Sequence, residues 1–344
     1  MSKENRTEIG DLGEFGLIEK IAALVVPTQA STIKGIGDDA AVFRATDEKY
    51  TLLSTDMLLE GIHFDLSYMP LQHLGYKAVA VNVSDIAAMN GIPRQLTVNL
   101  GLSNRFSVEA VEALYKGIAA AADAFDVDVV GGDTTASPSG LVISVTVFGE
   151  TTPDQVVYRS GANENDIVCV TGDLGAAYMG LQVLEREKQV YMTQPDMQPD
   201  LEKYNYIVGR QLRPNARMDI VHELAEKGLR PTSMIDVSDG LASDLFHLCK
   251  ASGLGVSVYE DKLPIDAQTY ETAAEFGIDP NTCAINGGED YELLFTISQD
   301  DFEKIKNHAD IHTIGYMHAP EKGRVLVTRN QAVVELKAQG WKHF

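Results

Sequence analysis

Carboxylate side chains recur at turns along this chain, and most of these turns follow an apolar segment typical of a strand. Six segments show the pattern: Gly37-Asp38-Asp39, Ser54-Thr55-Asp56, Ser84-Asp85, Gly131-Gly132-Asp133, Asp236-Val237-Ser238-Asp239 and Gly287-Gly288-Glu289-Asp290. Carboxylates brought together would repel one another unless cations lay among them. Mg²⁺ is held by a few carboxylates together with substrate phosphates. The pattern therefore predicts an acidic cluster that holds a polyphosphate through divalent cations.

Two of these segments differ in how strongly they indicate a metal. Ser54, Thr55 and Asp56 end a predicted strand with three side-chain oxygens, all of which could position Mg²⁺. Taken alone, this segment is more typical of a capped strand end that leads into a turn. Asp85 lies within an apolar helical pattern, where a buried carboxylate needs a partner. We therefore favour a metal at Asp85.

Two further acidic turns have both a structural and a functional interpretation. The pair Gly131-Gly132 before Asp133 would let the backbone approach a phosphate, because glycine has no Cβ, but the same turn could be purely structural. Asp236 and Asp239 lie between a predicted strand and a predicted helix, whose N-terminus attracts anions. Ser238 or Asp239 could also simply cap that helix.

Four other side chains are candidates on the strength of their type. Arg159 offers a planar cation to a phosphate, although a surface ion pair is equally compatible. His63 could contact an anion or pack in the core. Tyr115, on an alanine-rich predicted helix, is more typical of a core residue. Trp341 is the only tryptophan, and it could stack on an aromatic substrate or anchor the C-terminal tail.

Composition narrows the class of protein. The 344 residues carry a formal net charge of −22, so we expect no nucleic-acid partner, which would need a basic surface. The three cysteines, Cys169, Cys249 and Cys283, lie far apart in apolar surroundings, which is typical of reduced core residues and predicts a cytoplasmic protein. No apolar segment is long enough to cross a membrane. The Gly-x-x-x-x-Gly-Lys-Ser/Thr loop, the signature motifs of protein kinases and the Gly-x-Ser-x-Gly elbow are all absent.

Hydrophobic periodicity predicts a mixture of helices and strands, of α/β or α+β class. Helices are expected at Leu12–Val26, Gly75–Met89, Ser107–Phe125, Leu174–Glu187, Pro214–Lys227 and Gly240–Ser252. Strands are expected at 40–43, 50–54, 95–101, 127–130, 141–149, 166–171, 233–237, 291–297, 325–328 and 332–336. Residues 189–202 are expected to form a surface loop, and a second domain is expected to begin near residue 151.

Taken in order, the chemical segments resemble those of the thiamine-monophosphate kinase family. The resemblance rests on Gly35–Ala41, Ser54–Met57, Gly61–Phe64, Lys77–Met89, Gly131–Thr135, Arg159–Ala162, Arg213-Pro214, Asp236–Leu241, Gly287–Leu293 and Gly340–Phe344. Each segment is short, but their order and joint presence are specific, and they span nearly the whole chain. The acidic loop at 189–202 looks longer than is usual in the family.

The resemblance implies the fold of aminoimidazole ribonucleotide synthetase and its relatives. In that fold an N-terminal α/β domain (1–150 here) binds ATP and Mg²⁺ and forms a homodimer through its sheets. A C-terminal α+β domain (151–344) completes the nucleotide and substrate site. The implied reaction converts ATP and thiamine monophosphate into ADP and thiamine diphosphate, the last step of thiamine diphosphate biosynthesis, by direct in-line transfer with several Mg²⁺ ions.

The resemblance also implies residue roles. The implied Mg²⁺ ligands are Asp39, Ser54, Thr55, Asp56, Asp85, Asp133, Asp236 and Asp239, of which Asp56, Asp85 and Asp239 are the expected catalytic groups. The implied ATP contacts are Gly132, Asp133, Arg159, Ser238 and, more weakly, Tyr115. The implied contacts to thiamine monophosphate are His63, Glu289 and Trp341.

Two kinds of alternative remain open at this stage. Another enzyme of the same superfamily is possible on grounds of fold, most of all aminoimidazole ribonucleotide synthetase itself. The selenophosphate synthetase and hydrogenase-maturation members should each carry a functional cysteine, near the N-terminus and at the tail respectively, where this chain has none. A non-catalytic Ca²⁺-binding protein is the alternative from a different class, and it predicts EF-hand or repeat spacing that the sequence lacks.

Overall fold

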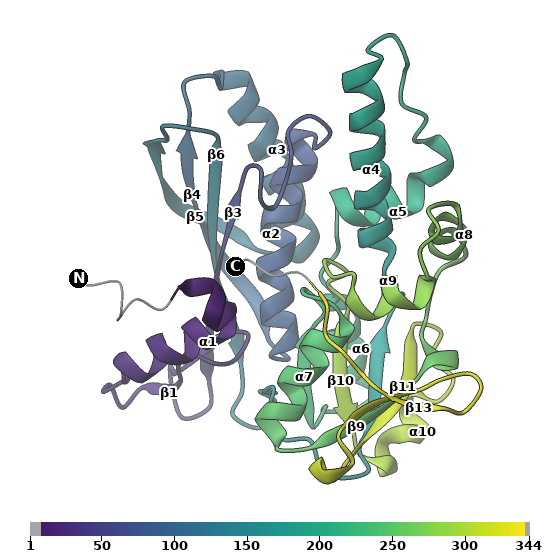
Figure 1. Cartoon of the computed structure of the whole chain (residues 1–344). Helices are drawn as coiled ribbons and strands as arrows, with labels where there is room; N and C mark the ends of the chain where they lie inside the picture. Colours follow the sequence, from purple (N-terminus) through teal and green to yellow (C-terminus); the bar gives the residue numbers. More distant parts are fainter. Residues whose placement is uncertain (1–7, 341–344) are drawn as a thin grey trace.

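Two β-sheets, each with its own helices, form the two halves of the molecule (Figure 1). The computed structural model describes residues 8–340. The first sheet has six strands and is built from residues 32–151, and the second has seven strands and is built from residues 167–335. Within the described residues, no helix is long and apolar enough to cross a membrane.

The first sheet has the strand order β1-β2-β3-β6-β4-β5 and is antiparallel except for the pair β4–β5. Its strands are β1 (Thr32–Lys34), β2 (Ala41–Arg44), β3 (Tyr50–Leu59), β4 (Ile92–Leu102), β5 (Asp128–Ala136) and β6 (Leu141–Thr151). Its helices are α1 (Ile9–Leu24), α2 (Leu71–Ala88) and α3 (Val108–Phe125).

Side-chain alternation gives this sheet one covered and one open face. Leu58, Val98 and Val145 are buried on the face that α2 covers. Thr55 and Phe148 point to the other face and are exposed, because successive residues of a strand point to opposite sides. No helix of the described residues covers that second face.

Helix α2 is enclosed between the two halves. It contacts β3, β4 and β6 of the first sheet and also β8, α5 and α6 of the second half. Two glycines let α3 pack closely against it: a Cβ at Gly75 would lie 2.1 Å from the carbonyl oxygen of Leu114, and one at Gly117 would lie 1.9 Å from that of Gln72. Polar residues on α2 therefore have protein on nearly every side.

The second sheet has the order β13-β12-β9-β11-β7-β10-β8, with β9–β12 as its parallel pair. Its strands are β7 (Ile167–Thr171), β8 (Ser233–Asp236), β9 (Gly255–Tyr259), β10 (Leu293–Ile297), β11 (Ile311–His318), β12 (Arg324–Val327) and β13 (Val333–Glu335). Its helices are α4 (Ala176–Thr193), α5 (Asn205–Leu212), α6 (Met218–Glu226), α7 (Leu241–Ser252), α8 (Ala267–Glu275), α9 (Pro280–Asn286) and α10 (Phe302–Ile305).

The expected mixture of helices and strands is confirmed, with differences in detail. The strand predicted at 127–130 continues to Ala136 as β5, and the helix predicted to begin at Pro214 begins at Met218. Helix α4 extends to Thr193, so it includes the first residues of the predicted loop at 189–202. The sequence interpretation missed β1, α5, β9, α8, α9, α10 and β11.

Candidate active site

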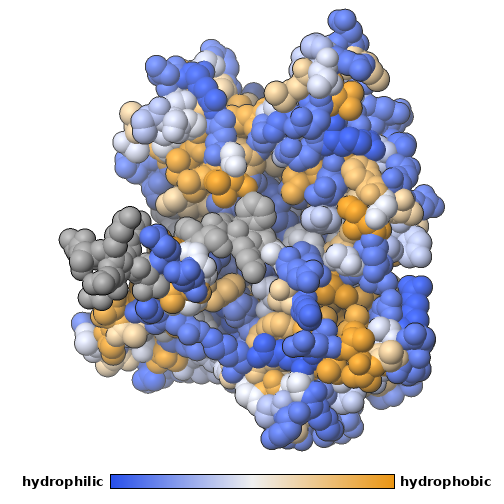
Figure 2. All heavy atoms as spheres, in the orientation of Figure 1, coloured by the Kyte–Doolittle hydropathy of each residue, from blue (hydrophilic) through white to orange (hydrophobic). Residues whose placement is uncertain are grey.

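A large cleft with a volume of about 1520 Å³ lies where the two halves meet, and residues of both line it. Figure 2 shows the surface hollowed between the two upper lobes, which contain α3 and α4 (Figure 1). Glu14 and Phe15 of α1 also line the cleft, and the Phe15 ring packs on His247 of α7 with 4.2 Å between the ring centroids. Helix α1 therefore borders the cleft and bridges the two halves.

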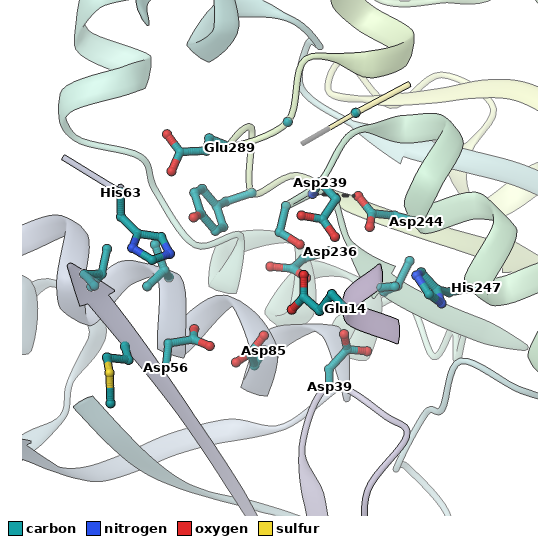
Figure 3. Close-up of a pocket in the computed structure, with 18 of the residues that line it drawn as sticks. Glu14, Asp39, Asp56, His63, Asp85, Asp236, Asp239, Asp244, His247 and Glu289 are labelled. Carbon is teal, nitrogen blue, oxygen red and sulfur yellow. Dashed lines mark hydrogen bonds between the residues drawn. The ribbon is translucent and has the colours of Figure 1, made fainter. Parts of the chain in front are cut away.

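Three carboxylates form the centre of this cleft. Asp39, Asp85 and Asp236 each offer an oxygen within 4.8 Å of the others. Asp39 precedes β2, Asp85 lies in α2 and Asp236 ends β8, so the cluster joins both halves of the molecule. Asp56 of β3 lies beside them (Figure 3). The structure thus brings together four aspartates that the sequence predicted as metal ligands.

Neighbouring side chains hold these carboxylates in place. The Ser54 hydroxyl donates to Asp85, and the Ser84 hydroxyl donates to Asp236 Oδ2 at 2.5 Å. The Arg159 guanidinium donates to Asp39 Oδ1 through Nη2 at 2.6 Å and Nε at 3.2 Å. Asp39 Oδ2 is buried and has no hydrogen-bond partner within the described residues.

The electrostatics of the cluster indicate a site for cations. Burial, together with the charge of Asp39, raises the pKa of Asp56 to about 6 and that of Asp236 to about 7. Burial and the charges of Asp56 and Asp236 raise the pKa of Asp85 well above its ordinary value. Burial and the neighbouring charges thus disfavour the anionic forms of Asp56, Asp85 and Asp236. Hard divalent cations would relieve this repulsion and would also satisfy Asp39 Oδ2, so the residues present fit Mg²⁺.

Thr55 does not join this cluster through its hydroxyl. It follows Ser54 on β3 and therefore points to the opposite face of the sheet. There its Oγ1 donates to the Val145 carbonyl at 3.0 Å and lies 3.0 Å from Thr146 Oγ1. The segment lies inside a strand and not at its end, so Thr55 faces away from Ser54 and Asp56, and its role as a Mg²⁺ ligand stays a prediction.

The turn after β8 lines the same cleft with Ser238 and Asp239. It is fixed by Asp244 of α7, which the sequence interpretation missed. Asp244 Oδ2 accepts the backbone N–H groups of Asp239 at 3.2 Å and Gly240 at 3.1 Å. Burial, with the charges of Asp239 and Asp236 next in effect, raises the pKa of Asp244 well above its ordinary value. An Asp four residues after the helix-opening glycine was the available signal.

His63 and Glu289 lie apart from the aspartate centre, in another part of the pocket (Figure 3). His63 Nδ1 accepts the backbone N–H of Leu59 at 3.0 Å, which fixes its ring. Glu289 Oε2 accepts hydrogen bonds from Lys77 Nζ at 2.9 Å and from Gln211 Nε2 at 2.6 Å. The sequence interpretation missed Lys77 and Gln211, although a lysine within the apolar pattern of α2 was as unusual as Asp85.

Three expected site residues do not line this cleft, and a fourth is not among the residues that the structure describes. Gly132 and Asp133 lie on the edge strand β5, where Asp133 lines a second hollow of about 430 Å³ with Asn99 and Ser144. Gly132 is required for strand packing, since a Cβ there would lie 1.7 Å from the Val98 carbonyl oxygen. Tyr115 is partly exposed on α3. Trp341 lies outside the described residues. The roles predicted for these residues remain predictions.

Comparison with known proteins places the chain in a family. Residues 37–151 match the family model described as AIR synthase related protein, N-terminal domain, and residues 163–328 match its C-terminal domain. The thiamine-monophosphate kinase of Bacillus subtilis (strain 168) is 35% identical over 340 residues, which cover 97% of this chain and 100% of that protein. The chain belongs to the thiamine-monophosphate kinase family. The corresponding kinase of Aquifex aeolicus (strain VF5) is 36% identical over 335 residues, covering 97% of this chain and 99% of that kinase.

Solved structures agree with this assignment. A structure described as AaThiL complexed with AMPPCP and TMP has 33% identity and a TM-score of 0.84, covering 99% of this chain and 100% of that chain. A HypE–HypF complex, at 21% identity and a TM-score of 0.70, shares the fold alone; it covers 94% of this chain and 99% of that chain. The predicted fold class, that of the aminoimidazole ribonucleotide synthetase relatives, is confirmed.

Proposed function

We propose that this protein transfers the γ-phosphoryl group of ATP to thiamine monophosphate, giving ADP and thiamine diphosphate. The observation that carries the proposal is the aspartate cluster of Asp39, Asp56, Asp85 and Asp236 within a cleft between the two halves. It is supported by the similarity to AaThiL, whose two named ligands correspond to an ATP analogue and thiamine monophosphate. An acidic protein with a net charge of −22 binds two phosphate compounds only where cations screen them.

The proposed division of the cleft follows its chemistry. The residues that fit Mg²⁺ are Asp39, Ser54, Asp56, Asp85, Asp236 and Asp239, with Thr55 and Asp133 as further predicted ligands. Bound Mg²⁺ would neutralise phosphate charge and orient the γ-phosphoryl group for in-line attack. Arg159 and Ser238 would contact ATP near this centre. His63 and Glu289, which lie apart from the centre, would contact thiamine monophosphate, as would Trp341.

In this reaction the side chains of the protein mainly position the reactants, and proton transfer to or from them is less important. The attacking oxygen belongs to a phosphate that is already ionised near pH 7, so no strong general base is required. Asp56, Asp85 and Asp239 would act by holding charge in a fixed arrangement, because fixed electrostatic groups stabilise a transition state without reorganising. Direct attack also means that no phosphorylated intermediate forms on the protein.

We further propose that two copies form the working unit in the cytoplasm. The open face of the first sheet carries Phe148 and Thr55. Gly132, Asp133 and Tyr115 do not line the cleft of their own chain. A second copy packed on that sheet would let Gly132 and Asp133 contribute to a shared nucleotide site. The cytoplasm agrees with the three free, buried cysteines.

One experiment tests the proposed reaction. Purified protein is incubated with ATP, Mg²⁺ and thiamine monophosphate, and the products are separated by chromatography. We expect ADP and thiamine diphosphate in equal amounts, and neither product in excess EDTA. Aminoimidazole ribonucleotide synthetase chemistry would instead release ADP only with its own acceptor, and a Ca²⁺-binding protein would release none. Failure to form thiamine diphosphate would overturn the proposal.

A further inference from the structure

Lys77 is the one lysine among the large, fully buried side chains of the described core. It lies in the middle of α2 with 0% of its side chain exposed. Its ammonium group donates to Glu289 Oε2 at 2.9 Å and to the Gln211 carbonyl oxygen at 3.3 Å. Burying an ammonium is costly unless a counter-charge and hydrogen bonds compensate it. Glu289 therefore supplies the counter-charge that offsets the cost of burying the Lys77 ammonium group.

Glu289 belongs to the cleft as well as to this ion pair. It lines the cleft, and 30% of its side chain remains exposed. Both side-chain hydrogen bonds, from Lys77 and from Gln211, fall on Oε2. Within the described residues, no hydrogen bond to Oε1 is formed, so this oxygen is available to a ligand. The carboxylate is held on one side and open on the other.

The side-chain amide of Gln211 is oriented so that it donates to Glu289, although this leaves its own oxygen unpaired. Its amide nitrogen donates to Glu289 at 2.6 Å, while its Oε1 is buried without a partner in the described chain. The reversed amide would place oxygen against carboxylate, which is repulsive. Leaving a buried acceptor unpaired costs free energy. Lys77 and Gln211 thus both hold the Glu289 carboxylate in position.

The backbone at Glu289 is also held in place by its surroundings. Glu289 has a φ of +58°, in the left-handed region that non-glycine residues rarely adopt. Its N–H donates to the Ser238 carbonyl at 2.7 Å, and the next residue, Asp290, accepts the N–H of Gly175 at 2.8 Å. Strained residues of this kind persist where surrounding structure determines them, and they cluster at ligand sites.

We propose that Lys77 is a positioning residue for substrate recognition: with Gln211 it holds the Glu289 carboxylate so that Oε1 faces a cationic or N–H-bearing ring. This inference rests on the proposed function, because the ring it names is that of thiamine monophosphate. Lys77 does not touch the substrate in this arrangement. It lies in α2 of the first half and holds a loop of the second half, so the substrate end of the cleft depends on this contact between the two halves.

A purely structural role makes different predictions. If Lys77 only neutralised a buried contact between the two halves, its loss would lower stability and disturb ATP and thiamine monophosphate alike. If Lys77 acts through Glu289, its loss should affect the substrate end selectively. The effect should also vanish when Glu289 can no longer serve as an anion. A double-mutant cycle therefore separates the two roles.

The test compares Lys77→Met, Glu289→Gln and the double variant in steady-state kinetics with both substrates varied. We expect Lys77→Met to raise KM for thiamine monophosphate about 10-fold or more, since hydrogen bonds to charged groups are the stronger ones. KM for ATP should change less than about twofold. In the Glu289→Gln background, Lys77→Met should add less than about twofold. Equal changes in both KM values, or additive effects on KM for thiamine monophosphate, would overturn the inference.

Two further variants provide a control and a second test. Lys203→Met removes a lysine that pairs with Glu275 on the surface, away from the residues that line the cleft, so it controls for loss of charge and should leave both KM values unchanged. Gln211→Leu removes the second donor to Glu289 Oε2 and decides the matter if Lys77→Met does not fold. It should raise KM for thiamine monophosphate with the same dependence on Glu289, and no effect there would overturn the inference. If the unaltered protein does not turn over thiamine monophosphate, the proposed function fails and this assignment falls with it.

Discussion

Individual carboxylates at the centre of the cleft are placed where each destabilises the others as an anion. Asp85 shows this most clearly, because it lies in α2 at the edge of the cleft and faces Asp56 and Asp236. Such an arrangement is unfavourable for an empty protein and favourable for one that binds cations. The same reasoning predicts that removing one carboxylate affects catalysis far more than folding.

The first prediction concerns Asp56→Asn and Asp85→Asn. Each should lower kcat by about 10²-fold or more, which is the scale of losing one fixed electrostatic group at a transition state. Neither should lower the melting temperature of the metal-free protein, since the amide relieves repulsion. Steady-state kinetics with thermal denaturation in EDTA would check both parts. An unchanged kcat in both variants would reject their assignment as metal ligands.

The second prediction concerns pH and Asp236, whose pKa is raised from 3.8 to about 7 by burial and the charge of Asp39. The folded protein therefore binds a proton that the unfolded chain releases near pH 4. Stability from this group is fully present below about pH 4 and is lost as pH rises toward 7. Asp236→Asn, whose amide resembles the protonated acid, should gain stability relative to the unaltered protein across that range.

Denaturant unfolding in EDTA at pH 4.5, 5.5, 6.5 and 7.5 would measure this difference. Comparing the two proteins at each pH cancels the titration of groups that they share. Mg²⁺ should also raise the melting temperature of the unaltered protein more at pH 7.5 than at pH 5.5, because protons compete with the metal for the carboxylates. A difference that stays constant with pH would contradict the assignment of a raised pKa to Asp236.

At the scale of helices and strands, the sequence predicted those elements whose side chains repeat regularly. Helix α2 was found because Val79, Val83 and Ile86 recur at helical spacing, and strand β4 because its apolar residues alternate. Strand β9 and helix α9 were missed because they are short and buried. Periodicity cannot distinguish such segments from loops or from one another.

In the candidate site too, some residues could be predicted from the sequence and others only from the assembled fold. The sequence could predict Asp39, Asp85 and Asp236, since carboxylates beside or within apolar segments need a special environment. It could not predict that β3 continues to Leu59 and turns Thr55 away from Asp56, because that depends on pairing with β6. Lys77 needed a partner from a loop 212 residues later, which only the assembled fold supplies.

The third prediction contrasts two glycines in different elements. Gly288 has a φ of +81°, and a Cβ there would lie 2.7 Å from the Ser238 carbonyl oxygen, so Gly288→Ala should cost about 1–3 kcal/mol. Gly209 lies in α5 with open space around it, so Gly209→Ala should stabilise the protein by roughly 0.5–1 kcal/mol. Gly288→Ala should also raise KM for thiamine monophosphate, because it displaces Glu289. Urea unfolding and kinetics would measure both; equal stability of the two variants would contradict this account.

At the scale of the whole molecule, the first sheet has a large face with no helix on it in the described structure. Phe148 is 37% exposed at the centre of that face, on β6. The edge strand β5, separated from β6 by β4, is exposed along its whole length and includes Val129 and Val130. An exposed phenylalanine on an uncovered sheet face and exposed valines on its edge strand are typical of an interface. The residues predicted to contact ATP from β5 lie at this same side of the molecule.

The fourth prediction is that Phe148→Asp converts a homodimer into a monomer. The charge would be buried at the interface but solvated in a single copy, so the monomer should still fold. Light scattering should give twice the chain mass of 37.4 kDa for the unaltered protein and the single mass for the variant. Val108→Asp is the control: Val108 is 71% exposed at the start of α3, where an acid suits the helix N-terminus, and the dimer should persist. A monomeric unaltered protein would refute the dimer.

Complementation then asks whether each site draws on both copies. If Asp133 acts across the interface, Asp85→Asn and Asp133→Asn should each be inactive alone, because every site lacks one carboxylate. Mixed dimers would contain one site with both defects and one site with neither. Refolding the two variants together in equal amounts should therefore restore about one quarter of the normal kcat, since half of the dimers are mixed and half of their sites are intact. No recovery, in a mixture shown to contain mixed dimers, would mean that Asp133 serves its own chain, and full activity of Asp133→Asn alone would mean that Asp133 serves no site.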